Sequence, residues 1–376
     1  RQMCIRDRYM IILLTGATGT LGSRILFSLL EERWTDIEQI YLPVRERKSN
    51  TPESRISKML SSNFAPDFIK KNSIAISSKI TIVPGNKLLS PITFLGNNKI
   101  THFIHSAGLV NLSTAPEAKE QIFEENLEFT KRIFETYKGL MGKFIYISTA
   151  FSVGNVEGLI PNDYLSKKPT SHRNHYEASK YATEKHVMQA GKDSAIPVQI
   201  LRPSVLGGNI IDTPSFFISK YMVFYLFAKF FHRNTSEDSI RITANAESGL
   251  NIIPTDYAAR VIVAVFETNV EQLNIVHSKT THITSGITKI LESVDFKNFK
   301  LTKNMVSTAT GFESKLEKFY YDTIGVHLTP YLTSKPCEWD TTILEAILPM
   351  PSYNLQDYLG DTIQFAKTQG FKSQQW

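Results

Sequence analysis

Cysteine is almost absent from this sequence, since Cys4 and Cys337 are its only two cysteines among 376 residues. So few cysteines exclude a disulfide framework and a cysteine-rich metal site, and they predict a reducing, cytoplasmic setting. His102 and His105 lie three residues apart on a predicted strand, so their side chains point to opposite faces of the sheet. We therefore expect no metal site.

Long apolar runs are missing too. The most aromatic stretch, residues 214–231, is shorter than the roughly 20 residues that a membrane span needs, and it contains Lys220 and Lys229. Residues 1–9 lack the apolar core of a signal peptide, so we interpret them as a non-native leader before Met10. The net charge is only +6, and basic and aromatic residues do not alternate, so we expect no nucleic-acid partner.

A glycine turn is the most informative feature that is present. Residues 15–22 read T-G-A-T-G-T-L-G and lie between the apolar run 11–14 and a helical pattern over 23–30. A helix that starts after such a turn offers unpaired backbone N–H groups and a partial positive charge to a phosphate. The turn therefore predicts a dinucleotide site, with these candidate residues: Gly16, Thr18, Gly19, Thr20, Leu21 and Gly22.

A second constellation indicates proton-transfer chemistry. Tyr176 and Lys180 are spaced four apart on a predicted helix and so share one face. Upstream, an apolar strand ends in Ser148 and Thr149, at the edge where a parallel sheet exposes its ligand crevice. We expect one of these two hydroxyls to hold a carbonyl oxygen, and we expect the charge of Lys180 to lower the pKa of Tyr176.

The second predicted strand ends in a run of cations, Arg45-Glu46-Arg47-Lys48. Folds specific for NAD place an acidic residue there, whereas Arg can bind a 2′-phosphate with two parallel hydrogen bonds. The run favours NADPH over NADH, and an ordinary solvated charge run is the alternative interpretation.

Strand and helix patterns alternate over the first two hundred residues, which predicts an α/β fold with a Rossmann-type, doubly wound parallel sheet. We assign residues 10–208 to the NADP-binding domain and 209–376 to a smaller, mainly helical substrate cap. We expect some strand and helix of the cap region to return to the Rossmann core, and we expect Val276 and Ile283 to lie in strands. We expect the polar end, 367–376, to be frayed. The predicted strands after the first are 40–44, 80–85, 102–108, 144–148 and 198–203, and the clearest helices are 117–137 and 175–190.

Together these motifs resemble the extended short-chain dehydrogenase/reductases. Within that superfamily the sequence is similar to the male-sterility group, which comprises fatty acyl reductases and thioester reductase domains. The similarity rests on residues 12–19, 41–45, 105–111 and 251–257, and on Asn126 with Thr130. Two residues depart from the group's pattern, because Asn86 replaces an aspartate and Gly108 replaces an alanine.

The resemblance implies a role for each site residue. Thr149 holds the developing oxyanion, because the residue before Ala150 has this role in the family. Tyr176 donates the proton, and Lys180 orients the nicotinamide ribose. The further cofactor contacts that the resemblance implies are Arg45, Asn86, Ala107, Gly108, Asn126, Ser148, Pro203 and Val205.

The expected activity is reduction by NADPH of a fatty acyl thioester, on coenzyme A or an acyl carrier protein, to an aldehyde or alcohol. We expect no covalent thiol step, because Cys4 lies in the leader and Cys337 is far in sequence from the motifs. Residues 214–231 form a buried cap helix, a wall of an apolar substrate tunnel or a peripheral membrane contact. The alternative activities are a ketone or hydroxyl dehydrogenase, a nucleotide-sugar epimerase and an NADPH sensor without turnover.

Overall fold

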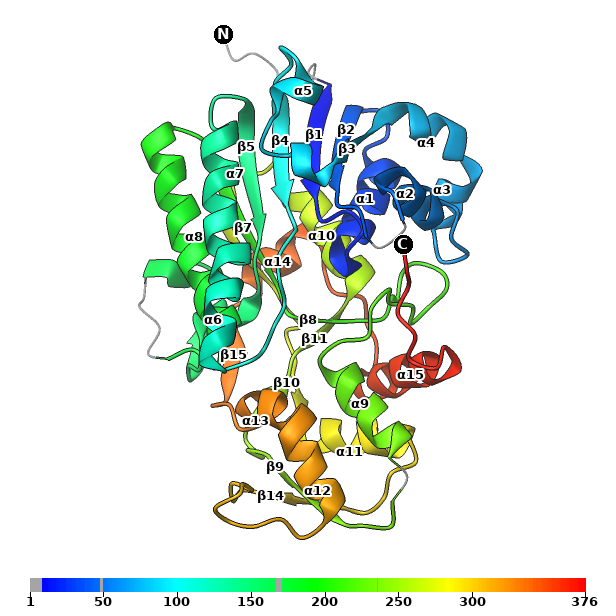
Figure 1. Ribbon diagram of the computed structural model, residues 1–376, viewed down its shortest axis with the longest axis vertical. Helices are drawn as coiled ribbons and strands as arrows, with labels where there is room; N and C mark the ends of the chain where they lie inside the picture. The colour runs from blue at the N-terminus through cyan, green and yellow to red at the C-terminus, as the bar shows by residue number, and fades with distance from the viewer. Residues whose placement is uncertain (1–8, 48–49, 167–170, 235) are drawn as a thin grey trace.

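The computed structural model describes residues 9–47, 50–166, 171–234 and 236–376 (Figure 1). Nearly all of the leader assigned to residues 1–9, and Lys48 of the cation run, lie outside the described residues. In the described part of the chain, no helix is both long and apolar enough to cross a bilayer.

The central sheet is parallel and has seven strands in the order β12-β7-β5-β4-β1-β2-β3. Chain order reverses beside β1, whose neighbours are β2 and β4, so the glycine turn after β1 lies at the topological switch point. This is the doubly wound sheet that the alternating pattern predicts. The strands are β1 (Met10–Thr15), β2 (Ile37–Val44), β3 (Ile80–Pro84), β4 (Ile100–His105), β5 (Met141–Ile147), β7 (Val198–Pro203) and β12 (Gln272–Ile275).

Helices cover both faces of this sheet (Figure 1). On one face, α1 (Thr20–Glu32) and α10 (Thr255–Val265) bury apolar residues against β1 and β2. On the other face lie α6 (Pro116–Phe123), α7 (Phe129–Tyr137) and α8 (His175–Ser194). The predicted helix over 117–137 is present, but a π-helical turn, Glu124–Glu128, interrupts it. The shorter helices are α2 (Pro52–Leu60), α3 (Asp67–Lys71), α4 (Ser73–Lys79), α5 (Ile92–Leu95) and α14 (Thr342–Ile347).

The cap lies below the sheet in Figure 1 and has its own apolar core, in which Tyr225, Phe231 and Tyr320 are buried. Its helices are α9 (Phe224–Arg233), α11 (Ile283–Ser293), α12 (Lys315–Tyr320), α13 (Val326–Leu332) and α15 (Leu355–Thr368). Four two-stranded sheets lie in and beside it: β9 (Ile240–Thr243) with β14 (Phe299–Thr302), β10 (Gly249–Leu250) with β13 (Thr281–His282), β8 (Val205–Gly207) with β11 (Ile252–Pro254), and β6 (Gly158–Ile160) with β15 (Cys337–Trp339).

The structure corrects two expectations about the cap. The interpretation of residues 214–231 as one helix was wrong, because only the part from Phe224 is helical. Before it the chain is irregular, with a left-handed φ of 64° at Phe216 and 52° at Val223. Val276 and Ile283 follow β12 and β13 directly instead of lying within them.

The expectation of a frayed C-terminal segment was also wrong. Helix α15 continues to Thr368, and Trp376 is buried against Phe217. The indole Nε1 of Trp376 donates a hydrogen bond of 3.2 Å to the carbonyl of Thr18, in the glycine turn. A polar composition suggested fraying, but one aromatic side chain attaches this segment to the sheet layer.

Candidate active site

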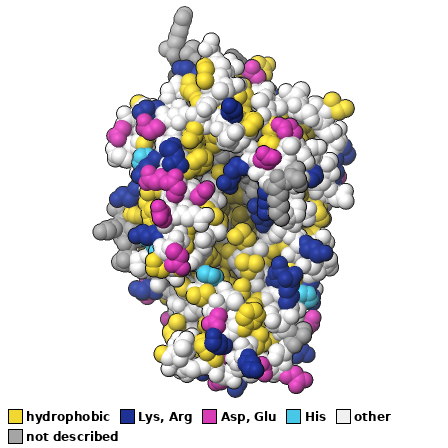
Figure 2. All heavy atoms as spheres, viewed as in Figure 1, with side chains coloured by type: hydrophobic (Ala, Val, Ile, Leu, Met, Phe, Trp, Pro, Cys, Tyr) yellow, Lys and Arg dark blue, Asp and Glu magenta, His cyan; other side chains and the backbone are white. Residues whose placement is uncertain are grey.

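A cavity of about 540 Å³ lies between the carboxyl ends of the strands and the cap. In Figure 2, hydrophobic side chains gather in the hollow between the two layers, with Lys and Arg side chains beside them. The cavity is lined by the glycine turn, the end of β5, the start of α8 and several cap segments. This is where ligands bind in open α/β sheets.

The glycine turn is packed too closely for side chains. Gly16 has a φ of 75°, and a Cβ on Gly22 would lie 2.1 Å from the carbonyl oxygen of Gly16. Gly19 precedes α1 and caps it without a side-chain hydrogen bond, so the first N–H groups of α1 remain available to a phosphate. The residues of the turn that line the cavity are Gly16, Gly19, Thr20, Leu21 and Gly22.

The structure brings Thr149, Tyr176 and Lys180 together on the wall of this cavity. Thr149 follows β5, and the other two lie on the first turns of α8, whose N-cap Asn174 accepts a hydrogen bond from the backbone N–H of Glu177. The Thr149 side chain lies close enough to the phenol of Tyr176 to lower the pKa of that phenol, against the larger effect of burial. A hydroxyl beside a phenol at a cavity wall can bind and protonate a carbonyl oxygen.

Burial controls the charges of this group. It lowers the pKa of Lys180 to about 7, an effect that the Glu184 carboxylate opposes. Burial raises the pKa of Tyr176 well above its ordinary value, and the charge of Glu177 adds to that rise. The expectation that Lys180 lowers the pKa of Tyr176 is therefore wrong, because burial raises that pKa and Lys180 is not among the groups that shift it. The Nζ of Lys180 instead donates a hydrogen bond of 2.9 Å to the carbonyl of Ile147.

Ser148 belongs to a buried polar network behind this wall. Its hydroxyl donates to the carboxylate of Glu184, which also accepts a hydrogen bond of 2.6 Å from Ser152. Arg202 Nη2 lies 2.9 Å from the other carboxylate oxygen, and both side chains of this ion pair are fully buried. Ser148 also lines the cavity, but its hydroxyl hydrogen is already used within the protein.

Two predicted cofactor contacts support the cavity wall from behind. Asn126, in the π-helical turn, accepts a hydrogen bond of 2.8 Å from the N–H of Leu109 and donates one of 3.1 Å to its carbonyl. The N–H of Ala107 donates to Thr15 Oγ1 at 3.2 Å. Neither Asn126 nor Ala107 is among the residues that line the cavity, whereas Gly108, Pro203 and Val205 are.

The predicted contacts for the adenosine half of a cofactor lie outside the cavity lining. Arg45 is 82% exposed and forms an ion pair of 3.8 Å with Glu125, and Asn86 is exposed as well. The hydroxyl of Thr18 faces Arg55, which donates to it at 2.8 Å. These three predicted contacts, Arg45, Asn86 and Thr18, are not among the cavity-lining residues.

Sequence reasoning missed Arg55 and Lys220 as members of this region. Arg55 lies on the amphipathic α2 and is buried, although an arginine on such a helix is ordinarily solvated. Lys220 lines the cavity from the cap. No sequence motif marks either residue, because it is the packing of the cap that brings Lys220 here.

The far part of the cavity is apolar. From the aromatic segment 214–231, the residues that line it are Ile218, Lys220, Met222, Val223, Phe224 and Phe227. Tyr225 and Phe231 pack into the cap core instead. Opposite, α11 and α13 contribute Ile287, Ile290, Leu328 and Leu332. The segment is therefore partly cavity wall and partly core.

Cys337 also lines the cavity, although it is distant in sequence from every motif. Distance along the chain was thus a poor reason to set it aside. Burial raises the pKa of its thiol, so the neutral form is favoured over the reactive thiolate.

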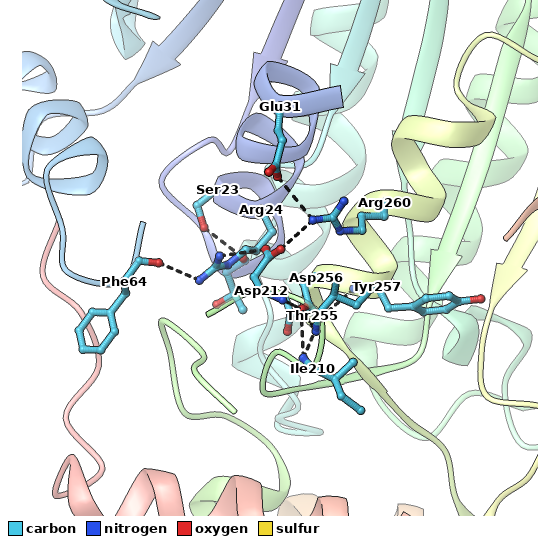
Figure 3. A network of polar contacts seen from close by, with 12 residues as sticks. Ser23, Arg24, Glu31, Phe64, Ile210, Asp212, Thr255, Asp256, Tyr257 and Arg260 are labelled. Atoms are coloured by element: carbon cyan, nitrogen blue, oxygen red, sulfur yellow. Dashed lines mark hydrogen bonds and ion pairs between the residues drawn. The ribbon is translucent and has the colours of Figure 1, made fainter. Parts of the chain in front are cut away.

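A polar cluster joins the cap to the sheet layer (Figure 3). The buried carboxylate of Asp256, on α10, accepts hydrogen bonds from the backbone N–H groups of Ile210, Ile211 and Asp212, at 3.0, 2.6 and 2.7 Å. The Asp212 side chain in turn binds Arg24 of α1 at 3.2 Å and Arg260 of α10 at 2.8 Å. These contacts fix the chain at the point where it leaves β8 for the cap.

Comparison with known proteins agrees with the resemblance to the male-sterility group that the sequence motifs indicate. A model of the family described as "Male sterility protein" matches residues 14–262. A Drosophila melanogaster protein, named provisionally as a fatty acyl-CoA reductase, is 26% identical over 330 residues, covering 76% of this chain and 56% of its own length. Fatty acyl-CoA reductase 1 of Gallus gallus is 26% identical over 231 residues, covering 53% of this chain and 43% of its own. The chain thus spans about half the length of these curated relatives.

Solved structures share the fold. The terminal R domain from the myxalamid PKS-NRPS biosynthetic pathway superposes with a TM-score of 0.70 at 20% identity, covering 99% of this chain and 94% of that one. UDP-glucuronic acid 4-epimerase from Bacillus cereus, in complex with NAD, gives 0.63 at 17% identity, covering 96% and 98%. Proteins with different activities therefore share this architecture, and the substrate must be argued from the cavity.

Proposed function

The chain belongs to the male sterility protein family, and on that premise we propose that it is an NADPH-dependent reductase of fatty acyl thioesters. The acyl group would be carried on coenzyme A or on an acyl carrier protein, and the product would be an aldehyde or an alcohol. The observation that carries the proposal is the apolar cavity that runs from Thr149 and Tyr176 into the cap.

The residues of the cavity fit a nicotinamide dinucleotide. The closely packed turn at Gly16 and Gly22 and the open N-terminus of α1 suit the pyrophosphate. Lys180, at the cavity wall, suits the nicotinamide ribose hydroxyls. When bound, the cofactor supplies a hydride to the carbonyl carbon.

The protein's own groups provide the remaining chemistry. Thr149 donates a hydrogen bond to the carbonyl oxygen as negative charge develops on it. Tyr176 then transfers its proton to that oxygen, and the raised pKa of its phenol keeps this proton in place at neutral pH. Lys180, beside the same wall, orients the ribose, and its ammonium form stabilises the Tyr176 phenolate that this transfer leaves. The hemithioacetal formed in this way then collapses: its C–S bond breaks, its hydroxyl proton passes to the leaving thiolate, and the thiol of the carrier and the aldehyde are released.

The substrate class follows from the far part of the cavity. Phe224, Phe227 and Leu328 present apolar surface where a nucleotide sugar would need hydrogen-bond donors and acceptors. Each buried CH₂ of a bound chain contributes about 0.8 kcal/mol. Catalytic efficiency should therefore rise with acyl chain length until the cavity is full.

The test is NADPH oxidation measured over a series of acyl-CoA and acyl carrier protein thioesters, with long-chain ketones and UDP-sugars in the same panel. We expect thioesters to be reduced and kcat/KM to climb about threefold or more per added CH₂. A flat chain-length profile, or turnover of only ketones or sugars, would contradict the proposal.

Substitutions in the cavity wall test where the acyl chain of the substrate lies. Phe224→Asp or Phe227→Asp should flatten the chain-length profile while leaving NADPH affinity unchanged. Phe319→Asp, at a cap phenylalanine that is 48% exposed, is the matched control and should change neither property. A normal profile in a folded Phe227→Asp protein would place the acyl chain elsewhere.

A further inference from the structure

Residues 217–221 connect the two apolar cores of the molecule. Phe217 is buried in the core of the sheet layer, where its ring stacks on Phe64 at a centroid distance of 4.2 Å. Tyr221 is buried in the cap core, with its ring 5.1 Å from Tyr225 and 5.9 Å from Phe371. Because both ends are anchored, the position of Lys220 between them is well defined.

This connecting segment lies over the phosphate end of the cavity. Ser219 Oγ donates a hydrogen bond of 3.3 Å to the hydroxyl of Thr20, the first residue of α1. Lys220 lines the same cavity as Gly16, Gly19 and Thr20. A lysine of the cap therefore lies at the part of the cavity where the glycine turn would receive the cofactor's phosphates.

Lys220 belongs to a group of cations that also includes Arg45, Arg47 and Arg55. Burial and the charges of these three arginines lower the pKa of Lys220. Burial and the charges of Arg47 and Arg45 lower the pKa of Arg55 in the same way. Four positive charges, from the segment after β2, from α2 and from the cap, are thus close enough to act on one another.

Among the described residues, one exposed side-chain carboxylate forms an ion pair with this group. Arg45 forms an ion pair of 3.8 Å with Glu125, and both side chains are exposed. In the described part of the chain, neither Lys220 nor Arg55 forms an ion pair, and Glu46 forms none either. Arg55 is only 8% exposed, and its guanidinium donates hydrogen bonds to the carbonyl of Arg45 at 2.7 Å, to Thr18 Oγ1 at 2.8 Å and to the backbone oxygen of Trp376 at 3.2 Å, while its Nε has no partner. Unpaired cations beside a cavity destabilise one another until an anion binds.

We propose that Lys220 is a ligand of the cofactor's adenosine 2′-phosphate, supplied by the cap to a site that Arg45, Arg47 and Arg55 form on the sheet layer. The proposal rests on the NADPH preference in the proposed function. A phosphate held from both sides links the cap to the sheet layer, so cofactor binding also fixes the wall of the acyl cavity. NADH, which lacks this phosphate, would leave Lys220 unpaired.

The test measures binding, without any acyl substrate. The full chain is titrated calorimetrically with 2′,5′-ADP and with 5′-ADP, which lacks the 2′-phosphate, for the parent, Lys220→Met and Lys220→Arg. Lys220→Met should weaken 2′,5′-ADP about tenfold or more and 5′-ADP less than about threefold, whereas Lys220→Arg retains most of the affinity. Lys229→Met removes the same charge from α9, outside the cavity lining, and should change neither affinity.

A second measurement separates a binding role from a structural one. Because Lys220 is repelled by its neighbours, unliganded Lys220→Met should melt at the same temperature as the parent or higher. Affinity for 2′,5′-ADP within twofold of the parent, equal weakening of both ligands or a lowered Tm would overturn the role of Lys220. A parent that binds 5′-ADP as tightly as 2′,5′-ADP would overturn the NADPH preference too, so the two failures are distinguishable.

Discussion

The hydroxyl of Ser148 donates a hydrogen bond to the carboxylate of Glu184, which lies one helical turn beyond Lys180 on α8. The same carboxylate ion-pairs with Arg202. The next residue, Thr149, instead lies beside the phenol of Tyr176 at the cavity wall. Two adjacent hydroxyls at the end of β5 therefore have different partners, one inside the protein and one at the cavity wall.

This difference predicts unequal effects of removing each hydroxyl. Thr149→Val should lower kcat about 10²–10³-fold, because it removes a donor to the developing oxyanion. Ser148→Ala should lower kcat less than about tenfold but lower the Tm, because a buried carboxylate loses a hydrogen bond. Steady-state NADPH oxidation and thermal melting check both, and the opposite ranking in kcat would make Ser148 the oxyanion donor.

Tyr176→Phe should nearly abolish turnover while leaving NADPH affinity within about threefold of the parent. The phenol supplies a proton to the product oxygen, and such general acid catalysis is worth about 10²–10⁴-fold. Single-turnover kinetics and a fluorescence titration of NADPH give the two quantities. Turnover within about twofold of the parent would remove Tyr176 from the mechanism.

Arg45→Ala should weaken NADPH more than NADH, because only NADPH carries a 2′-phosphate. A charge-assisted hydrogen bond is worth about 1.5–3 kcal/mol, which corresponds to roughly 10–150-fold in affinity. The Kd of each cofactor is measured by titration. Equal weakening of both cofactors would show that Arg45, which is largely exposed, is part of an ordinary solvated charge run.

Lys180 predicts a pH-dependent change in stability. Burial lowers its pKa to about 7 from 10.5, so between these values the unfolded chain binds the extra proton. Stability should therefore rise with pH across this window, and below pH 7 the folded protein carries the full penalty of a buried ammonium.

Lys180→Met removes that penalty. Its Tm advantage over the parent should be larger at pH 6 than at pH 9, by about 2 °C or more. Lys192→Met, at an exposed lysine near the end of the same helix, is the control and should show no such difference. An advantage that is equal at both pH values would mean that burial does not lower the pKa of Lys180.

Local patterns were sufficient to predict the sheet layer. Apolar runs of strand length marked β1, β2, β3, β5 and β7 to within a few residues, and the alternation with helices predicted their parallel arrangement. The spacing of Tyr176 and Lys180 placed both on one face of α8, and the structure brings them to the cavity with Thr149. These features depend on neighbours in sequence, which is why they could be read from it.

Features that depend on distant contacts could not be predicted. The aromatic segment 214–231 suggested one helix. In the structure, Phe217 instead stacks on Phe64 in the core of the sheet layer, and α9 begins only at Phe224. The pKa of Tyr176 is raised by burial and by the charge of Glu177, and the nearby lysine does not lower it. The individual cofactor contacts at Asn86, Ala107 and Asn126 remain predictions.

The Asp256 cluster has a consequence for grafting caps between relatives. Asp256 and Arg260 lie on α10 and Arg24 lies on α1, so the groups that hold residues 210–212 belong to helices that pack in the core of the sheet layer and not in the cap core. A chimera that imports only a foreign cap would bring a connecting segment that these side chains do not match. Substrate preference should be transferable between such proteins only when this attachment point is transferred as well.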